Sequence, residues 1–256
     1  MLTDAHTHLH DKKFSKIIDQ VIRRAKEENI VTIINNGIDY KSNRETLELA
    51  EKYDIIEPAL GIHPTEISKT NTSKEIDFIE SQKDKIIAIG EIGLDKHWNP
   101  EELESQKEVF IKLLKLAEKI KKPVIIHSRK AEKEVIEMLQ TTNLKHVVLH
   151  SFNGNFNLVK KAENLGYKFS IPVSIMNSHH FQNMVNQLSI SSILTETDAP
   201  YLSPFKKLNE PSYIRFTIKK ISEIKKLSLP EVEKLLYMNF QDTFYSSSSI
   251  TSKSFR

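Results

Sequence analysis

Six residues that commonly bind divalent cations follow short apolar segments scattered along the chain. They are His6, His8, Glu91, His127, His150 and Asp198. Neutral imidazole suits zinc, manganese, iron or nickel, and carboxylate oxygen suits magnesium or manganese. If the fold brings these segments together at one edge, the six side chains predict a metal centre.

The His-x-His pair at the N-terminus has the spacing of two side chains on one face of a strand. His6 and His8 can therefore reach one ion, although such a pair alone is also typical of surface histidines. Glu91 lies in the apolar run Ile-Ala-Ile-Gly-Glu-Ile-Gly-Leu-Asp, where an unpaired carboxylate would be costly. We expect Glu91 to bind metal, and with two oxygens it could bridge two ions; the alternative is a structural ion pair.

His127 and His150 follow consecutive apolar segments. A lone histidine in this position is more often a core residue, but two facing the same edge favour metal binding. Asp95 could orient a metal ligand or cap the next turn, and Glu196 is interpreted as a hydrogen-bond partner. The remaining histidines are assigned surface or loop positions: His10, His97, His146, His179 and His180.

Four histidines and two carboxylates exceed the three protein ligands typical of a single catalytic zinc. Two ions about 3.5–4 Å apart fit the number better, and such a pair can activate one water for an in-line displacement. This chemistry serves phosphodiesters, phosphomonoesters and amides, so the ligands alone do not identify the substrate.

The elements that must position these residues alternate between β-type and helical segments. The β-type segments are 1–8, 30–35, 55–62, 86–94, 123–127, 146–152, 167–173 and 192–197. Eight strands with long crossovers in 256 residues predict an α/β fold, a single-domain (β/α)8 TIM barrel. A doubly wound sheet is disfavoured because no Gly-x-Gly-x-x-Gly follows the first strand. We expect the barrel to span residues 1–245 and the Ser-rich tail, 246–256, to be disordered.

Helix starts are also encoded locally. Asn99 is predicted to cap a helix that begins at Pro100, and Ser228 with Glu231 has capping-box spacing. Apolar residues repeat at helical spacing from Ile17 to Ala25 and from Val109 to Ile120.

Composition excludes several classes of protein. The absence of cysteine rules out disulfide scaffolds, Cys-ligated zinc fingers and thiol nucleophiles. A net charge of +3 gives no strong argument for a polyanionic partner, and the lysine-rich helices read as solvated faces. No apolar run is long enough for a bilayer and no signal peptide is evident, so a soluble cytoplasmic protein without an obligate protein partner is expected.

The motifs together resemble the TatD-like metal-dependent deoxyribonucleases of the amidohydrolase superfamily. The resemblance rests on Asp-Ala-His-Thr-His at 4–8, Gly-Ile-His-Pro at 61–64, Gly-Glu-Ile-Gly-Leu-Asp at 90–95, His-Ser-Arg at 127–129, His-Ser-Phe-Asn-Gly at 150–154, Glu-Thr-Asp-Ala-Pro-Tyr-Leu at 196–202 and Asn-Glu-Pro at 209–211. Two of these motifs, Gly-Glu-Ile-Gly-Leu-Asp and Glu-Thr-Asp-Ala-Pro-Tyr-Leu, are highly specific. The match covers almost the whole chain.

The resemblance implies a role for each residue. It assigns His6, His8 and Asp198 to one metal, His127 and His150 to a second, and Glu91 to a bridge between them. The implied ions are Mg²⁺, Mn²⁺ or Zn²⁺. His63 is implied to lie near the substrate phosphate, and Asp198 to be the base toward the nucleophilic water. Arg129 fits a phosphate contact, with a surface cation as the alternative.

The implied activity is hydrolysis of DNA phosphodiester bonds by a two-metal-activated water, as an exonuclease acting on single-stranded ends. An amide, lactone or small phosphoester hydrolase with the same ions is the second hypothesis. A metal-stabilised nucleic-acid-binding protein without turnover is the third. Departures from the family pattern concern substrate contacts: Thr65 stands where a histidine is frequent, and Leu208 where an arginine is frequent, in a short segment before Asn209.

Overall fold

Eight parallel strands and the helices between them form the fold. The computed structural model describes residues 1–245. The strands are β1 (Leu2–Thr7), β2 (Ile30–Asn36), β3 (Ile56–Leu60), β4 (Ala88–Asp95), β5 (Val124–Arg129), β6 (Val147–His150), β7 (Lys168–Pro172) and β8 (Ile193–Glu196). They pair in chain order in one sheet, and β8 lies beside β1. The predicted (β/α)8 barrel is confirmed.

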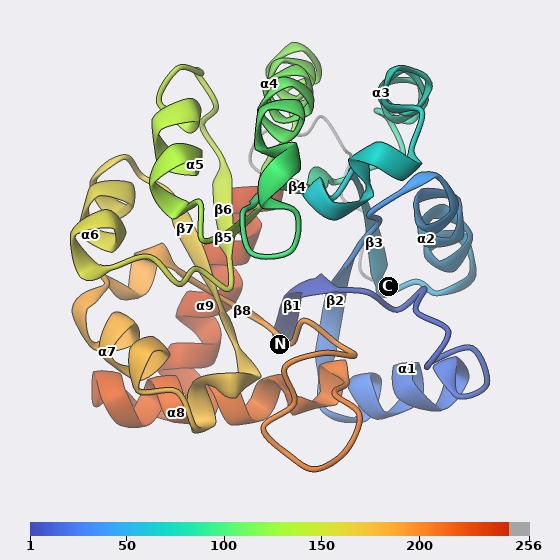
Figure 1. Cartoon of the computed structure of the whole chain (residues 1–256). Coiled ribbons are helices and arrows are strands. Elements are labelled where there is room, and N and C mark those ends of the chain that lie inside the picture. The colour runs from blue at the N-terminus through green and yellow to red at the C-terminus, as the bar shows by residue number, and fades with distance from the viewer. Residues whose placement is uncertain (246–256) are drawn as a thin grey trace.

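Helices surround the sheet, as Figure 1 shows. They are α1 (Ile18–Glu27), α2 (Tyr40–Lys52), α3 (Thr72–Ser81), α4 (Leu103–Ile120), α5 (Glu132–Leu139), α6 (Phe156–Asn164), α7 (His179–Gln187), α8 (Ile214–Lys225) and α9 (Leu229–Phe244). Short 3₁₀ segments precede or follow several of them: η1 (Pro64–Lys69), η2 (Pro100–Glu102), η3 (Val173–Met176), η4 (Ile190–Ser192) and η5 (Pro211–Tyr213). Among the described residues, no helix is both long and apolar enough to cross a membrane.

Side chains and backbone together close the seam between the first and last strands. The Thr195 hydroxyl of β8 donates to the Thr3 carbonyl of β1 at 2.9 Å. Just beyond β8, the Asp198 N–H donates to the His6 carbonyl, also at 2.9 Å. This pairing brings residues from opposite ends of the sequence to one side of the barrel.

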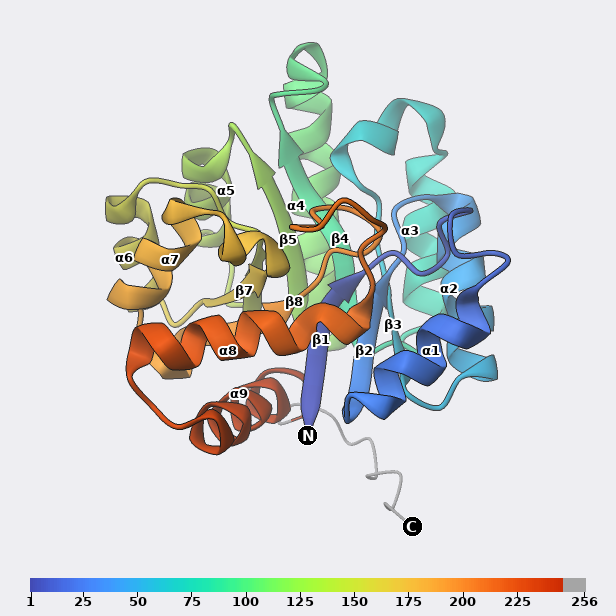
Figure 2. The same cartoon turned by 90° about the horizontal axis from the view of Figure 1, so that it is seen from below.

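Helix α9 covers the amino-terminal end of the barrel, and Figure 2 shows it beneath α8 and beside the start of β1. Asn239 of α9 donates to the carbonyls of Ile190 and Ile193, at the start of β8, at 2.7 and 2.9 Å. Phe240 and Phe244 are buried against the inward-facing apolar residues Ala5, Ile34, Ala59, Ile87, Ala88, Ile125, Val148 and Leu194. The lower part of the barrel is thus a packed core, which leaves the carboxyl-terminal ends of the strands for chemistry.

The helix signals in the sequence are confirmed in part. Ser228 and Glu231 form the predicted capping box at the start of α9. The prediction for Asn99 is wrong in detail, because its side chain makes no capping bond and Pro100 begins a 3₁₀ turn. The α-helix starts at Leu103. The Asn99 carbonyl accepts the Glu102 N–H at 3.2 Å in the 3₁₀ turn, and it also accepts the Gln106 side chain at 2.9 Å, which ties the turn to the helix. The predicted tail, 246–256, lies outside the described residues.

Candidate metal centre

Two of the predicted ligands, His127 and His150, continue inward-facing rows of the barrel. Ile125 and Val148 face the interior, and the period of two along a strand places His127 and His150 on the same side, one step closer to the mouth. His6 lies in β1 and His8 directly after it. The barrel therefore converts six distant sequence positions into one cluster.

One group of atoms has the spacing of a metal coordination shell. The Nε2 atoms of His6 and His8 are 3.1 Å apart. Glu91 Oε2 lies 3.4 and 3.2 Å from them, and Asp198 Oδ1 lies 3.6 and 3.5 Å from them. Ligand atoms about 2.0–2.2 Å from a shared cation are separated by about 2.8–3.6 Å. The donor set and its spacing thus fit a divalent cation.

Glu91 directs its other oxygen at a second group of imidazoles. Its Oε1 lies 2.8 Å from His127 Nδ1, 3.6 Å from His63 Nε2 and 3.9 Å from His150 Nε2. The side chain is only 3% exposed. A buried carboxylate with a different set of nitrogens at each oxygen has the arrangement expected of a bridge between two ions.

Neighbouring groups hold the imidazoles in the tautomers that metal binding requires. His8 Nδ1 lies 3.0 Å from the Asn36 carbonyl, and it can only donate to that oxygen. The neutral ring then carries its lone pair on Nε2, the atom that faces Glu91 and Asp198.

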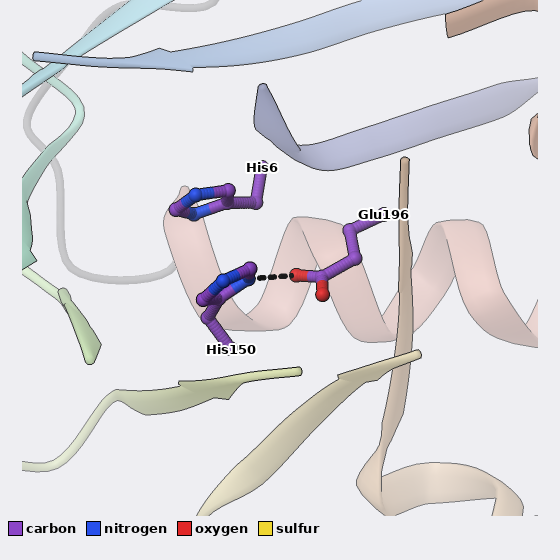
Figure 3. Close-up of side chains that lie close together, drawn as sticks. All are labelled: His6, His150 and Glu196. Carbon is purple, nitrogen blue, oxygen red and sulfur yellow. Dashed lines mark hydrogen bonds and ion pairs between the residues drawn. The ribbon is translucent and has the colours of Figure 1, made fainter. Parts of the chain in front are cut away.

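The second pair of histidines is oriented by carboxylates. Asp95 Oδ2 lies 3.0 Å from His127 Nε2, and Glu196 Oε2 lies 2.9 Å from His150 Nδ1 (Figure 3). Each carboxylate accepts a hydrogen bond from the ring nitrogen that carries the proton, and the other ring nitrogen of the same histidine then faces Glu91. Asp95 also accepts from the backbone N–H groups of His97 and Trp98, each at 2.8 Å, so it both orients a histidine and caps the next turn.

Three combinations of these side chains lie close enough to hold an ion, among residues 1–245. Within each, the nearest ligand atoms are at most 4.8 Å apart: His6, His8 and Asp198; His63, Glu91 and His127; His6, His150 and Glu196. In the third, a hydrogen bond between His150 and Glu196 occupies the atoms a cation would need (Figure 3). The other two combinations are the better candidates: Glu91 Oε2 lies against the first, and Glu91 itself belongs to the second. The tautomer of His63, described below, makes it a donor rather than a ligand, and His150 Nε2, 3.9 Å from Glu91 Oε1, is the remaining nitrogen beside Glu91 and His127.

Burial tunes the charges of these groups. Burial raises the pKa of the Asp198 carboxyl to about 6, although His150 and His8 act in the opposite direction. For Glu91, burial alone would raise the pKa, but His63 and His6 hold it well below its ordinary value. Glu91 is therefore ionised, as a bridging ligand must be, and Asp198 can exchange a proton near neutral pH.

His63 has the opposite tautomer from His8. Its Nδ1 accepts the Thr65 backbone N–H at 3.2 Å and also lies 2.7 Å from the Thr65 hydroxyl. Burial lowers the pKa of His63 to about 3, so the ring is neutral and its proton is on Nε2. That atom can donate a hydrogen bond into the site, which fits a phosphate contact better than a metal ligand. Thr65, in place of the frequent histidine, thus orients His63.

The cluster opens into a cavity of about 1020 Å³ at the carboxyl ends of the strands. Arg129, at the end of β5, lines this cavity with an exposed side chain. His10 lies in the loop after β1, as predicted, but it is not a surface residue: it lines the cavity, and its ring packs at 5.6 Å from that of His8. Sequence reasoning also missed Trp98, whose signal is an aromatic residue four positions after the end of the predicted strand 86–94.

An eight-stranded barrel with clustered histidines and carboxylates at its mouth is the architecture of a metal-dependent hydrolase. A sequence profile of the family described as "TatD related DNase" matches residues 3–245. The chain belongs to the TatD family of metal-dependent hydrolases, as its motifs had suggested.

Relatives from distant organisms support this assignment. An uncharacterized metal-dependent hydrolase of Methanocaldococcus jannaschii is 35% identical, over 92% of this chain and 94% of its own. The human protein named deoxyribonuclease TATDN3 is also 35% identical, over 93% of this chain and 92% of its own. The crystal structure of the TatD homolog YJJV from Escherichia coli superposes with a TM-score of 0.88 at 26% identity, over 95% of this chain and 97% of that one.

Proposed function

We propose that this chain is a deoxyribonuclease that removes nucleotides from single-stranded DNA ends with two divalent cations, Mg²⁺, Mn²⁺ or Zn²⁺. The observation that carries the proposal is Glu91, whose two oxygens face separate groups of histidines at the base of an open cavity. The name of the human relative supports DNA as the substrate. The ends of a strand are favoured because a continuous duplex cannot descend into a barrel mouth.

The ligands divide between two ions. His6, His8 and Asp198 would hold one cation, and His127 and His150 the other, with Glu91 shared. When bound, the pair would lower the pKa of a water and neutralise charge on the phosphoryl oxygens.

Three side chains would transfer the proton and bind the phosphates. The Asp198 carboxylate accepts the proton of the attacking water. The Nε2–H of His63 donates to a non-bridging phosphate oxygen as negative charge develops there. Arg129 binds the phosphate of the adjoining nucleotide through its planar guanidinium.

The test is incubation of the metal-reconstituted protein with end-labelled single-stranded and duplex DNA. We expect stepwise shortening of the single strand with at least one of Mg²⁺, Mn²⁺ or Zn²⁺. Full-length product with all three ions would refute the proposal. Hydrolysis of amide or lactone substrates, insensitive to added vanadate or phosphate, would instead favour a small-molecule hydrolase.

A further inference from the structure

Trp98 places a large aromatic side chain on the wall of the cavity. The residue is 63% exposed and lies in the loop between β4 and α4, where it lines the same cavity as the candidate metal ligands. A single exposed hydrophobic residue is ordinary on a protein surface. What distinguishes Trp98 is its connection to the metal centre on one side and to Arg129 on the other.

The backbone of Trp98 is fixed to the site through one carboxylate. Asp95 Oδ1 accepts the Trp98 N–H at 2.8 Å, and Asp95 Oδ2 lies 3.0 Å from His127 Nε2. Asp95 itself is completely buried. The backbone at Trp98 is therefore tied to the same carboxylate that orients His127, which places the indole on the loop beside the candidate metal centre.

Arg129 lies over the indole without an ionic partner. Its guanidinium carbon is 5.4 Å from the centroid of the Trp98 ring. Within residues 1–245, no carboxylate lies at ion-pair distance from Arg129. Its donors remain available for a ligand, and stacking on the ring restricts their orientation.

A second arginine, Arg44, also lies over aromatic rings, but its charge is used within the fold. Arg44 lies 3.6 Å from the ring centroids of both Tyr40 and Phe78. Its guanidinium, however, donates to buried Glu75 at 2.8 Å, so its charge is already neutralised. The pair formed by Trp98 and Arg129 has an exposed ring and a free charge, the two groups that a nucleotide's base and phosphate would need.

We propose that Trp98 is a stacking platform for an unpaired nucleobase, beside the nucleotide whose phosphate Arg129 binds. This inference rests on the proposed function and specifies how the substrate is recognised. An indole face accepts any base, so the platform favours single strands over duplexes with little sequence preference. A base held in a duplex cannot present its face to the indole without unpairing.

The first test uses fluorescence, because Trp98 is the only tryptophan in the chain. Metal-loaded protein is titrated with a single-stranded phosphorothioate oligothymidylate, which resists hydrolysis, and with an abasic oligomer of the same length and charge. We expect saturable quenching by the first and none by the second. Absent quenching, or equal quenching by the abasic oligomer, would overturn the platform.

The second test compares variants on single-stranded DNA. Trp98→Ala should raise KM about 10-fold with kcat within about 2-fold, and Trp98→Phe should recover most of the loss. Metal content should stay unchanged, because the backbone N–H that binds Asp95 is retained. Met238→Ala, an exposed side chain on α9 at the opposite end of the barrel, is the matched control.

The outcomes separate this inference from the proposed function. DNA cleavage that is unaffected by Trp98→Ala would overturn the platform and leave the nuclease intact. Base-dependent quenching without cleavage would support the platform and refute the nuclease. Neither quenching nor cleavage would overturn both.

Discussion

The Glu91 carboxylate lies between the two groups of candidate ligands and contacts both. Its Oε2 faces His6 and His8, and its Oε1 faces His127. We predict that Glu91→Ala lowers bound metal from two ions per chain to one or none and abolishes hydrolysis, with the circular dichroism spectrum retained. Elemental analysis of the dialysed protein measures the stoichiometry, and Glu45→Ala, elsewhere on the cavity wall, serves as control. Two ions per chain in the Glu91 variant would exclude the bridge.

His63 is expected to affect turnover rather than metal binding. Its protonated Nε2 makes it a donor, so His63→Ala should keep both ions and slow kcat about 100-fold. His63→Gln, which retains a donor amide, should recover part of the rate. The comparison variant His127→Ala should lose metal as well as activity. An unchanged kcat in His63→Ala would remove this side chain from the mechanism.

Residue types and their spacing were sufficient to predict which side chains converge at the mouth. They were not sufficient to predict the partners that fix each tautomer. Glu196 of β8 lies 2.9 Å from His150 of β6, two strands along the sheet and 46 positions away in sequence, and that proximity depends on how β6, β7 and β8 pair. The position of Trp98 on the cavity wall was not predictable, because a local sequence pattern does not show whether an exposed ring faces bulk solvent or a cavity.

At the scale of elements, the Asn-Glu-Pro segment fixes the loop that carries Asp198. Asn209 donates to the carbonyls of Thr197 and Tyr201, at 2.7 and 2.6 Å. The next residue, Glu210, is bound by Arg24 of α1 at 2.8 Å. The segment therefore connects the first helix to the loop after the last strand.

This connection predicts a pH-dependent contribution to stability. Burial would raise the pKa of Glu210, but Arg24 and Ser212 outweigh it and lower the pKa below 4.5. A carboxylate with a depressed pKa stabilises the fold above its unfolded pKa, and that contribution disappears as pH falls through the folded value. Glu210→Gln should therefore lower the free energy of unfolding by about 1 kcal/mol at pH 7 and by less near pH 3. The loss is modest because the Arg24 side chain is 36% exposed and water screens its charge. Urea unfolding at both pH values measures it, with exposed Glu101→Gln as control; a cost that persists at pH 3 would contradict the ionic origin.

Gly93 is the position at which β4 most strictly requires glycine. Its φ is +149°, and a Cβ there would lie 1.9 Å from the His127 carbonyl oxygen. Gly166 also has positive φ, +82°, but a Cβ there would meet nothing within 4 Å. We predict a loss in the free energy of unfolding of about 1 kcal/mol for Gly166→Ala and about 3 kcal/mol or more for Gly93→Ala. Equal losses would show that backbone conformation alone sets the cost.

Strands and amphipathic helices were predictable because each carries its own periodicity, and the capping box of α9 is a contact between near neighbours. The start of α4 was not, because the capping pattern does not encode the contacts of the Asn99 carbonyl, which accepts the Glu102 N–H in a 3₁₀ turn and the Gln106 side chain seven residues further on. Local signals locate an element well, but its first turn also depends on side chains folded back onto it.

For the whole molecule, we predict that metal binding contributes to stability. The proposed first ion joins His6 and Asp198, on either side of the seam between β1 and β8. Each ion at about 100 times its dissociation constant would add about 2.7 kcal/mol, so one ion alone would raise Tm by roughly 5–10 °C. Thermal unfolding with and without chelator tests this, and Glu91→Ala should show a smaller shift. Identical melting curves for the chelated and metal-loaded wild-type protein would contradict a buried, strongly bound pair.

Helix α9, which covers the amino-terminal end of the barrel, also limits the routes by which a substrate could enter and a product could leave. Phe240 and Phe244 pack into the interior there, so within residues 1–245 the end of the barrel opposite its mouth is filled by side chains. A polymer cannot be threaded through it in the manner of a ring-shaped exonuclease. Under the proposed exonuclease activity, each released nucleotide would have to leave by the route along which the strand entered, and the shortened strand could advance only after the product had left.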